Sequence, residues 1–197
     1  MTDPTLEEQI ATAGLTYGRL HDISYRAGLV MQILGAAVLA VLYPLENPFY
    51  TIGIMLFEAG ALLSGIFLLV WMSWIKKIIV GSILVGIPLQ IWGGLYAPEQ
   101  YAVQVIIIGV GLVCIGAGGM VGKEAYCFSY REGWMLLWLY PILVIANLLG
   151  KEHHVFNALG FSAAFLLLLS LVGKKLKQPL LSPCPTNVCK APEQKNK

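Results

Sequence analysis

Residues 101–121 read YAVQVIIIGVGLVCIGAGGMV, a run without a single charged side chain. A transmembrane helix needs about 20 mainly apolar residues, so this run is long enough to cross a bilayer. The whole chain has the same character, because 57% of its 197 residues are hydrophobic and only 12% are charged. Soluble domains carry about 25% charged residues. The sequence therefore predicts an integral membrane protein and excludes a soluble enzyme, a nucleic-acid-binding protein and a disordered scaffold.

Further apolar runs flank this one on both sides. Two of them contain a proline, Pro88 or Pro141, which we expect to kink its helix, because neighbouring helices in a bundle can satisfy the freed carbonyl. We predict an all-α polytopic membrane protein with a polar or amphipathic arm at residues 1–26, a six-helix transmembrane domain at 27–172 and a disordered polar tail at 173–197. The six predicted spans are residues 27–43, 50–74, 75–92, 101–121, 134–149 and 155–172.

The basic residues predict the orientation of these spans. With six spans, 12 of the 13 lysine and arginine residues share the side of the N-terminus, and only Lys151 lies on the other. Cytoplasmic segments carry an excess of lysine and arginine. We therefore predict that both termini are cytoplasmic. The early acidic residues and the lack of a short apolar core with a cleavage site argue against a signal or transit peptide.

Small residues recur on single helical faces in two of the predicted spans. Such residues let helix backbones approach closely within a bilayer. We interpret these faces as packing surfaces inside the bundle, with a groove for a partner helix or a flat pigment as the alternative. The two stripes are Gly53, Gly60 and Ser64 in the second span, and Gly111, Cys114, Gly118 and Gly122 in the fourth.

One carboxylate, that of Glu58, falls well inside a predicted span. At 1.5 Å per residue, Glu58 lies about 12 Å below the outer membrane surface. Gln90, Gln104 and Asn147 lie about 5–12 Å below the same surface. An ionisable group at this depth is costly and often functional. Two interpretations stay open, a structural hydrogen-bonded network or a cavity that holds a proton, a cation or the metal of a pigment.

The histidines and cysteines favour no metal site. His21, His153 and His154 all lie outside the predicted spans, so a buried haem with two histidine ligands is not supported. Cys184 and Cys189 stand in the tail, where they lack the further ligands that a zinc site needs. We predict no metal site, and the sequence leaves the cofactor undetermined.

The most distinctive stretch is GKEAYCFSYREG at residues 122–133, between the fourth and fifth predicted spans. Its balanced charges and its aromatic residues are typical of an amphipathic connector on the membrane surface. A reactive thiol is the alternative, because a nearby lysine or helix N-terminus can lower the pKa of a cysteine. The residues singled out here are Lys123, Glu124, Tyr126, Cys127, Phe128 and Glu132.

The KEAYCF motif at residues 123–128, with Glu132 after it, resembles the hallmark of a family of uncharacterised integral membrane proteins of cyanobacteria and plastids. The stretch DISYR at residues 22–26 is similar too, and the six-span layout matches over residues 15–175. The resemblance implies a photosynthetic membrane as the setting. It implies no activity and no catalytic residue.

These observations lead to three hypotheses for function. The first is a non-enzymatic assembly or stability factor for a larger membrane complex in a cytoplasmic or thylakoid membrane, with helices or a pigment as partners. The second is a small proton- or cation-coupled transporter or channel built around Glu58. The third is an intramembrane enzyme or redox protein that uses Cys127. The lipid bilayer is a partner in all three, and nucleic acid in none.

Overall fold

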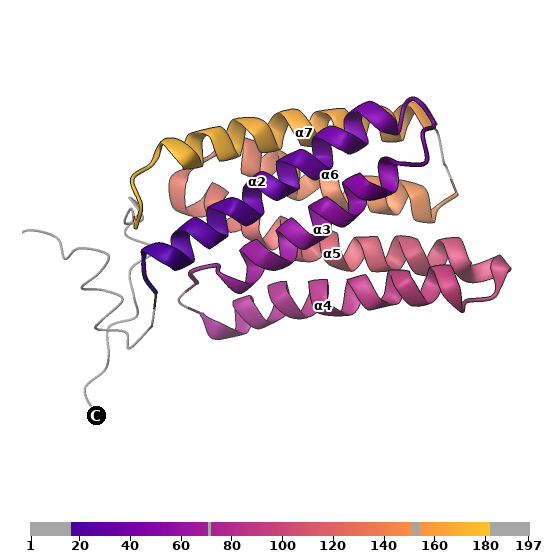
Figure 1. The fold of residues 1–197 in the computed structure, drawn as a ribbon, viewed down its shortest axis with the longest axis horizontal. Coiled ribbons are helices and arrows are strands. Elements are labelled where there is room, and N and C mark those ends of the chain that lie inside the picture. Colours follow the sequence, from indigo (N-terminus) through magenta and orange to yellow (C-terminus); the bar gives the residue numbers. More distant parts are fainter. Residues whose placement is uncertain (1–16, 71, 151–153, 182–197) are drawn as a thin grey trace, which may run out of the picture.

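The structure is a computed structural model that describes residues 17–70, 72–150 and 154–181. Those residues form α helices and no strand, so the described part of the chain is all-α, as predicted. Each predicted apolar run corresponds to one helix (Figure 1). The helices are α2 (Arg19–Leu42), α3 (Tyr50–Ile66), α4 (Ser73–Leu95), α5 (Glu99–Phe128), α6 (Arg131–Leu148) and α7 (His154–Lys177).

Four of these helices, α2, α4, α5 and α7, are long and apolar enough to cross a membrane. Helix α3 is a shorter apolar helix of 17 residues, and α6 has 18 residues. Large apolar side chains cover the outside of the bundle, among them Val85, Ile115 and Trp138, which are 58%, 54% and 68% exposed. Such a surface suits lipid rather than water. Six spans with cytoplasmic termini stay a prediction.

Several predicted boundaries are wrong. Helix α2 begins at Arg19 rather than at residue 27, α3 ends at Ile66 rather than at 74, and α7 continues to Lys177 rather than ending at 172. The polar ends of α2 and α7 lie past the apolar runs and share a partner, because Tyr25 on α2 and Lys175 on α7 both contact Glu124. Residues 1–16 of the predicted arm and 182–197 of the predicted tail, with Cys184 and Cys189, lie outside the described residues, as does His153.

Glycine contacts fix how α2 crosses α3. A Cβ atom added to Gly28 would lie 2.7 Å from the carbonyl oxygen of Gly60, and one added to Gly60 would lie 2.6 Å from that of Gly28. The two backbones are therefore in direct contact, as small residues permit in a membrane bundle. Helix α4 packs against α5 in the same way, through Gly86 and Gly109. Pro88 and Pro141 lie inside the helices α4 and α6, and the kink expected at each stays a prediction.

The two ends of the described chain meet at one end of the bundle, which we call the terminal end (Figure 1). Here the Arg26 guanidinium donates hydrogen bonds to the carbonyl oxygens of Gln178 and Pro179, at 2.7 and 2.8 Å. The backbone N–H of Leu181 donates to Asp22 at 3.1 Å. The segment that follows α7 is thus fastened to the first turns of α2.

Candidate functional site

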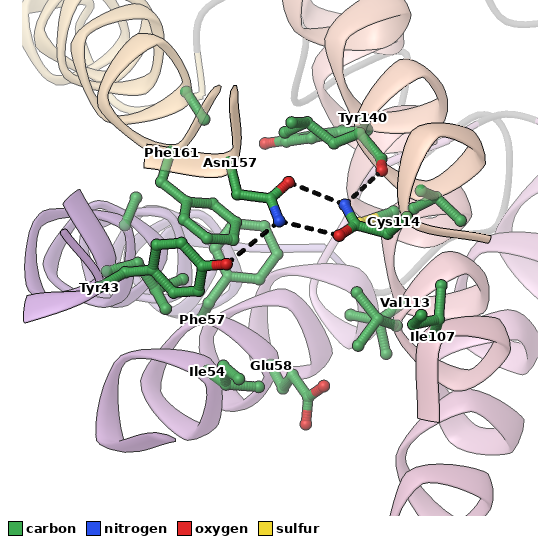
Figure 2. A pocket seen from close by; sticks show the side chains of 17 residues that line it. Tyr43, Ile54, Phe57, Glu58, Ile107, Val113, Cys114, Tyr140, Asn157 and Phe161 are labelled. Atoms are coloured by element: carbon green, nitrogen blue, oxygen red, sulfur yellow. Dashed lines mark hydrogen bonds between the residues drawn. The ribbon is translucent and has the colours of Figure 1, made fainter. Parts of the chain in front are cut away.

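A cavity of about 230 Å³ lies inside the bundle, in the half away from the terminal end. Helices α2, α3, α5, α6 and α7 all contribute to its wall, and most of the lining side chains are aliphatic or aromatic (Figure 2). Ligand sites typically combine such a wall with a few placed polar groups. The polar lining residues are Tyr43, Glu58, Cys114, Tyr140, Asn147 and Asn157.

Among the described residues that line this cavity, only Glu58, on α3, is charged. The side-chain amide of Gln90, on α4, donates a hydrogen bond to its Oε1 atom. Within the described part of the chain, no lysine, arginine or histidine forms an ion pair with Glu58. A carboxylate in an apolar bundle normally pairs with a cation or takes up a proton. The cavity leaves room for either beside Glu58.

Asn147 and Asn157 form a reciprocal amide pair across the cavity wall. Each Nδ2 donates to the other side chain's Oδ1 at 2.8 Å. The second proton of Asn147 goes to the carbonyl oxygen of Leu143 at 2.7 Å, and that of Asn157 to the Tyr43 hydroxyl at 3.1 Å. All four amide protons are therefore used, and the pair holds α6, α7 and the end of α2 together.

Unlike the two asparagine amides, the Tyr140 hydroxyl is buried without a hydrogen-bond partner among the described residues. The residue is 4% exposed and lines the cavity. A buried hydroxyl without a partner costs about 1–3 kcal/mol. Figure 2 shows Tyr140 and Asn157 on one side of the cavity and Glu58 on the other. A ligand with a polar group could satisfy this hydroxyl.

The four polar residues predicted to share the outer half of the bundle do not all meet. Glu58 and Gln90 are hydrogen-bonded, and Asn147 lines the same cavity as Glu58. Gln104 lies on the exposed side of α5, where its amide reaches carbonyl oxygens of its own helix. Sequence reasoning missed Asn157, although it is a polar residue inside an apolar run and the same rule applies to it.

Below the cavity, towards the terminal end, a layer of fully buried side chains closes the bundle. The Gln32 amide donates to the Ser64 hydroxyl at 2.8 Å, and that hydroxyl lies 3.2 Å from the Met120 sulfur. All three residues are 0% exposed. The cavity is therefore separated from the terminal end in this structure.

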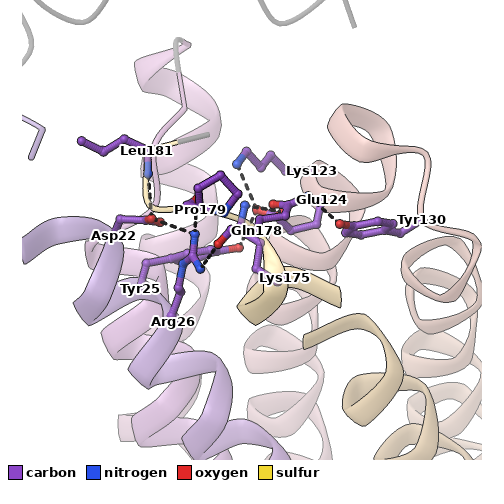
Figure 3. A network of polar contacts seen from close by, with 10 residues as sticks. All are labelled: Asp22, Tyr25, Arg26, Lys123, Glu124, Tyr130, Lys175, Gln178, Pro179 and Leu181. Carbon is purple, nitrogen blue, oxygen red and sulfur yellow. Dashed lines mark hydrogen bonds and ion pairs between the residues drawn. The ribbon is translucent and has the colours of Figure 1, made fainter. Parts of the chain in front are cut away.

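A second polar site, which we call the ionic cluster, lies at the terminal end and consists of Tyr25, Lys123, Glu124 and Lys175 (Figure 3). Glu124 is 0% exposed. Its Oε1 accepts a hydrogen bond from the Tyr25 hydroxyl at 2.9 Å and lies 3.0 Å from the Lys123 ammonium group. Its Oε2 lies 3.0 Å from the ammonium group of Lys175. The cluster thus ties α2, α5 and α7 to one carboxylate.

The ionic cluster corrects the interpretation of the stretch that contains the KEAYCF motif. Residues 123–128 are not a connector on the membrane surface but the last turns of α5. The helix continues because the Glu124 carboxylate turns inward to its lysine partners. Cys127 is 5% exposed, which does not suit a reactive thiol, since such thiols are accessible.

The remaining residues of that stretch lie around the cluster. Tyr126 is half exposed, and the Phe128 ring stacks on that of Tyr130 with centroids 5.7 Å apart. Glu132, in the first turn of α6, accepts hydrogen bonds from Ser170 and Lys174 on α7. These contacts serve packing between helices.

The two small-residue stripes have different surroundings. The Gly53, Gly60 and Ser64 stripe faces α2. Gly111, Gly118 and Gly122 face side chains of α6. Together with Cys114 and Gly119, the first two of these line a groove of about 680 Å³ over α5, between α4 and α6.

A family model matches residues 66–183, and it is described as an uncharacterised integral membrane protein family, DUF2301. The chain belongs to this family. Membership confirms the resemblance carried by the KEAYCF motif and confirms that the chain is an integral membrane protein. The match includes α4 to α7 and the motif, whereas Glu58 precedes it. No curated protein and no solved structure matches the chain.

Proposed function

We propose that this protein is a small transporter that carries a proton or a cation through the cavity around Glu58. The observation that carries the proposal is an acidic side chain on the wall of an intramembrane cavity, without a cationic partner among the described residues. Intramembrane carboxylates that face a cavity mark ion and proton pathways in many membrane proteins.

The arrangement around the cavity supports a transport cycle with two states. In this structure the layer of Gln32, Ser64 and Met120 closes the cavity towards the terminal end. A cargo that binds at Glu58 reaches that end only after α2 and α3 separate there or slide. Backbone atoms of Gly28, Gly35, Gly53 and Gly60 form much of their contact, which favours a sliding motion of α2 along α3.

The test is ion flux in liposomes that contain the purified protein. We expect the wild type to dissipate an imposed proton, sodium or potassium gradient faster than empty liposomes do. The Glu58→Gln variant keeps the hydrogen bond to Gln90 but cannot carry the charge, so its flux falls to the empty-liposome level. Gln104→Leu, on the exposed side of α5, is the matched control and keeps full flux. Equal flux from Glu58→Gln and wild type would falsify the proposal.

The groove between α4 and α6 supports a second candidate, an assembly or stability factor that holds a transmembrane helix of a partner protein. The groove is lined by Gly111, Gly118 and Gly119 of α5 and by apolar side chains of α4 and α6, and small residues of this kind are common where helices associate in lipid. The resemblance to proteins of cyanobacteria and plastids makes a photosynthetic membrane the place to look for the partner.

Co-purification in a mild detergent tests this candidate. We expect one partner at a stoichiometric level with the wild type and with Glu58→Gln. Ile115→Trp places a bulky ring in the groove at a position that is 54% exposed, so it should release the partner without unfolding the bundle. A partner retained by Ile115→Trp, or a lone monodisperse wild type, argues against the assembly role.

A further inference from the structure

Aromatic rings surround the cavity at Glu58. Tyr43, Phe57, Tyr140 and Phe161 all line it. The rings of Tyr43 and Phe161 are nearly perpendicular with centroids 4.9 Å apart, and those of Phe57 and Tyr140 are 6.1 Å apart in a similar geometry. Four rings from α2, α3, α6 and α7 thus meet around one small space.

The charge of the lining has one sign. Within residues 17–70, 72–150 and 154–181, the lining has Glu58 as its one acidic residue and includes no lysine, arginine or histidine. Aromatic faces attract cations, and cages of rings are a common way to bind alkylated ammonium groups. The side-chain oxygens of Asn147 and Asn157 already accept hydrogen bonds from each other, and most of the remaining wall is aliphatic or aromatic, so few oxygen ligands are left for a bare metal ion. The lining therefore suits a cation whose charge is wrapped in methyl or methylene groups.

The size of the cavity and its polar groups limit the class of ligand further. At about 230 Å³ the cavity is smaller than most drug-binding pockets, which begin at about 300 Å³. The buried Tyr140 hydroxyl lacks a partner among the residues described. Asn157, beside it on the same wall, has all its amide protons in use but keeps a free lone pair on Oδ1. A ligand hydroxyl near this wall would satisfy both groups.

We propose that the cavity binds a small organic cation, a tertiary or quaternary ammonium compound with short alkyl groups and a hydroxyl at the other end. The charged nitrogen lies between Glu58 and the rings, and the hydroxyl reaches Tyr140. The inference rests on the proposed function, because it names the substrate class of the same cavity.

The binding test uses the full chain in detergent and three probes of similar size. Choline carries both the charge and the hydroxyl, 3,3-dimethyl-1-butanol is its neutral carbon isostere, and tetramethylammonium lacks the hydroxyl. Titration calorimetry and the unfolding temperature report binding. We expect saturable binding of choline, weaker binding of tetramethylammonium and none of the neutral isostere.

Variants separate recognition from folding. Glu58→Gln should lose choline binding, and Gln104→Leu should keep it. Phe161→Leu removes one ring at a half-buried position and should weaken binding about tenfold, or about 1.4 kcal/mol, within the range of one cation–π contact. The unfolding temperature of Phe161→Leu shows whether that variant is folded, so the proposal can be tested even if Glu58→Gln does not fold.

The outcomes distinguish this inference from the proposed function. Equal binding of choline and its neutral isostere, or no saturable binding of either ammonium probe, overturns the proposed ligand class. In that case, Glu58-dependent ion flux still supports the proposed transport function. Charge-dependent choline binding without Glu58-dependent flux supports the proposed ligand class and overturns the proposed transport function. Binding that survives both Glu58→Gln and Phe161→Leu places the probe elsewhere and overturns the proposed site.

Discussion

Two acids of the bundle, Glu124 and Glu58, have opposite surroundings. Glu124, in the ionic cluster, has the Tyr25 hydroxyl and two ammonium groups within 3.0 Å. Glu58, in the cavity, has one neutral amide. The first site carries two positive charges for one negative charge, so it has no capacity for another cation. The second has an uncompensated acid beside empty space. The number of charged partners distinguishes the structural acid Glu124 from Glu58, the acid of the proposed binding site.

Replacing Glu124 should have the largest effect on stability. Glu124→Ala leaves Lys123 and Lys175 side by side without their shared carboxylate, and Lys175 is 5% exposed. Removing one partner of a buried ion pair costs about 3–5 kcal/mol. We expect this loss in the free energy of unfolding, measured by denaturant titration in detergent.

The matched control is Glu132→Ala. Glu132 pairs with Lys174, whose side chain is 48% exposed, and exposed pairs contribute about 0–1 kcal/mol. If the two variants lose equal stability, burial of the ionic cluster does not matter and the comparison between the two acids fails.

Arg26→Leu should have the next largest effect. The substitution removes the ion pair with Asp22 and both hydrogen bonds to the backbone after α7. Hydrogen bonds to a charged group contribute about 1.5–3 kcal/mol, and the Asp22 carboxylate keeps only the N–H of Leu181. We expect a loss of about 2–3 kcal/mol and faster proteolysis after Lys177. An unchanged cleavage rate would show that the segment after α7 is held by other contacts.

These two sites mark the limit of what the sequence could predict. The apolar runs predicted one helix each, and the rule for intramembrane charge found Glu58, because both signals are local. The ionic cluster joins Tyr25 to Glu124 and Glu124 to Lys175, and no local pattern shows that such distant residues meet. The same contacts explain why α2, α5 and α7 extend past their apolar runs.

The cavity was only partly predictable for a similar reason. Polarity within a span identified Asn147 and, applied to the last span, would also have identified Asn157, but it does not show that the two residues pair with each other. The glycine stripe on α5 was identified by its spacing, whereas the tightest contacts are made by Gly109 and Gly116, on a neighbouring face. Spacing defines a face but not its neighbour, which depends on how the helices are arranged.

At the cavity, Asn157→Leu should lower the free energy of unfolding by a moderate amount. The variant leaves Asn147 without its amide partner and the Tyr43 hydroxyl without its donor. Hydrogen bonds between membrane helices contribute about 0.6 kcal/mol each and at most about 1.7. We expect a loss of about 1 kcal/mol in the free energy of unfolding. A loss as large as that of Glu124→Ala would mean that the cavity wall is as structural as the ionic cluster.

Glu58→Gln should have a smaller effect on stability. The side chain keeps its shape and its contact with Gln90, and no ion pair with a described residue is broken. We expect a change below about 1 kcal/mol, because the hydrogen bond from Gln90 is weakened to a neutral one but not lost, together with the loss of flux and of choline binding. A large loss of stability would reveal a hidden structural partner and make Glu58 equivalent to Glu124.

Tyr140→Phe should destabilise the fold least and is the most selective probe of the cavity. The hydroxyl makes no hydrogen bond with the described residues, so its removal breaks none and relieves an unmet buried group. We expect no loss in the free energy of unfolding and a gain of about 1 kcal/mol, the lower end of the cost of an unsatisfied buried hydroxyl. The same variant should weaken the binding of choline but not of tetramethylammonium, because only choline has a hydroxyl that can bond to Tyr140. If both probes weaken equally, the hydroxyl does not contact the ligand and the orientation within the cavity is reversed.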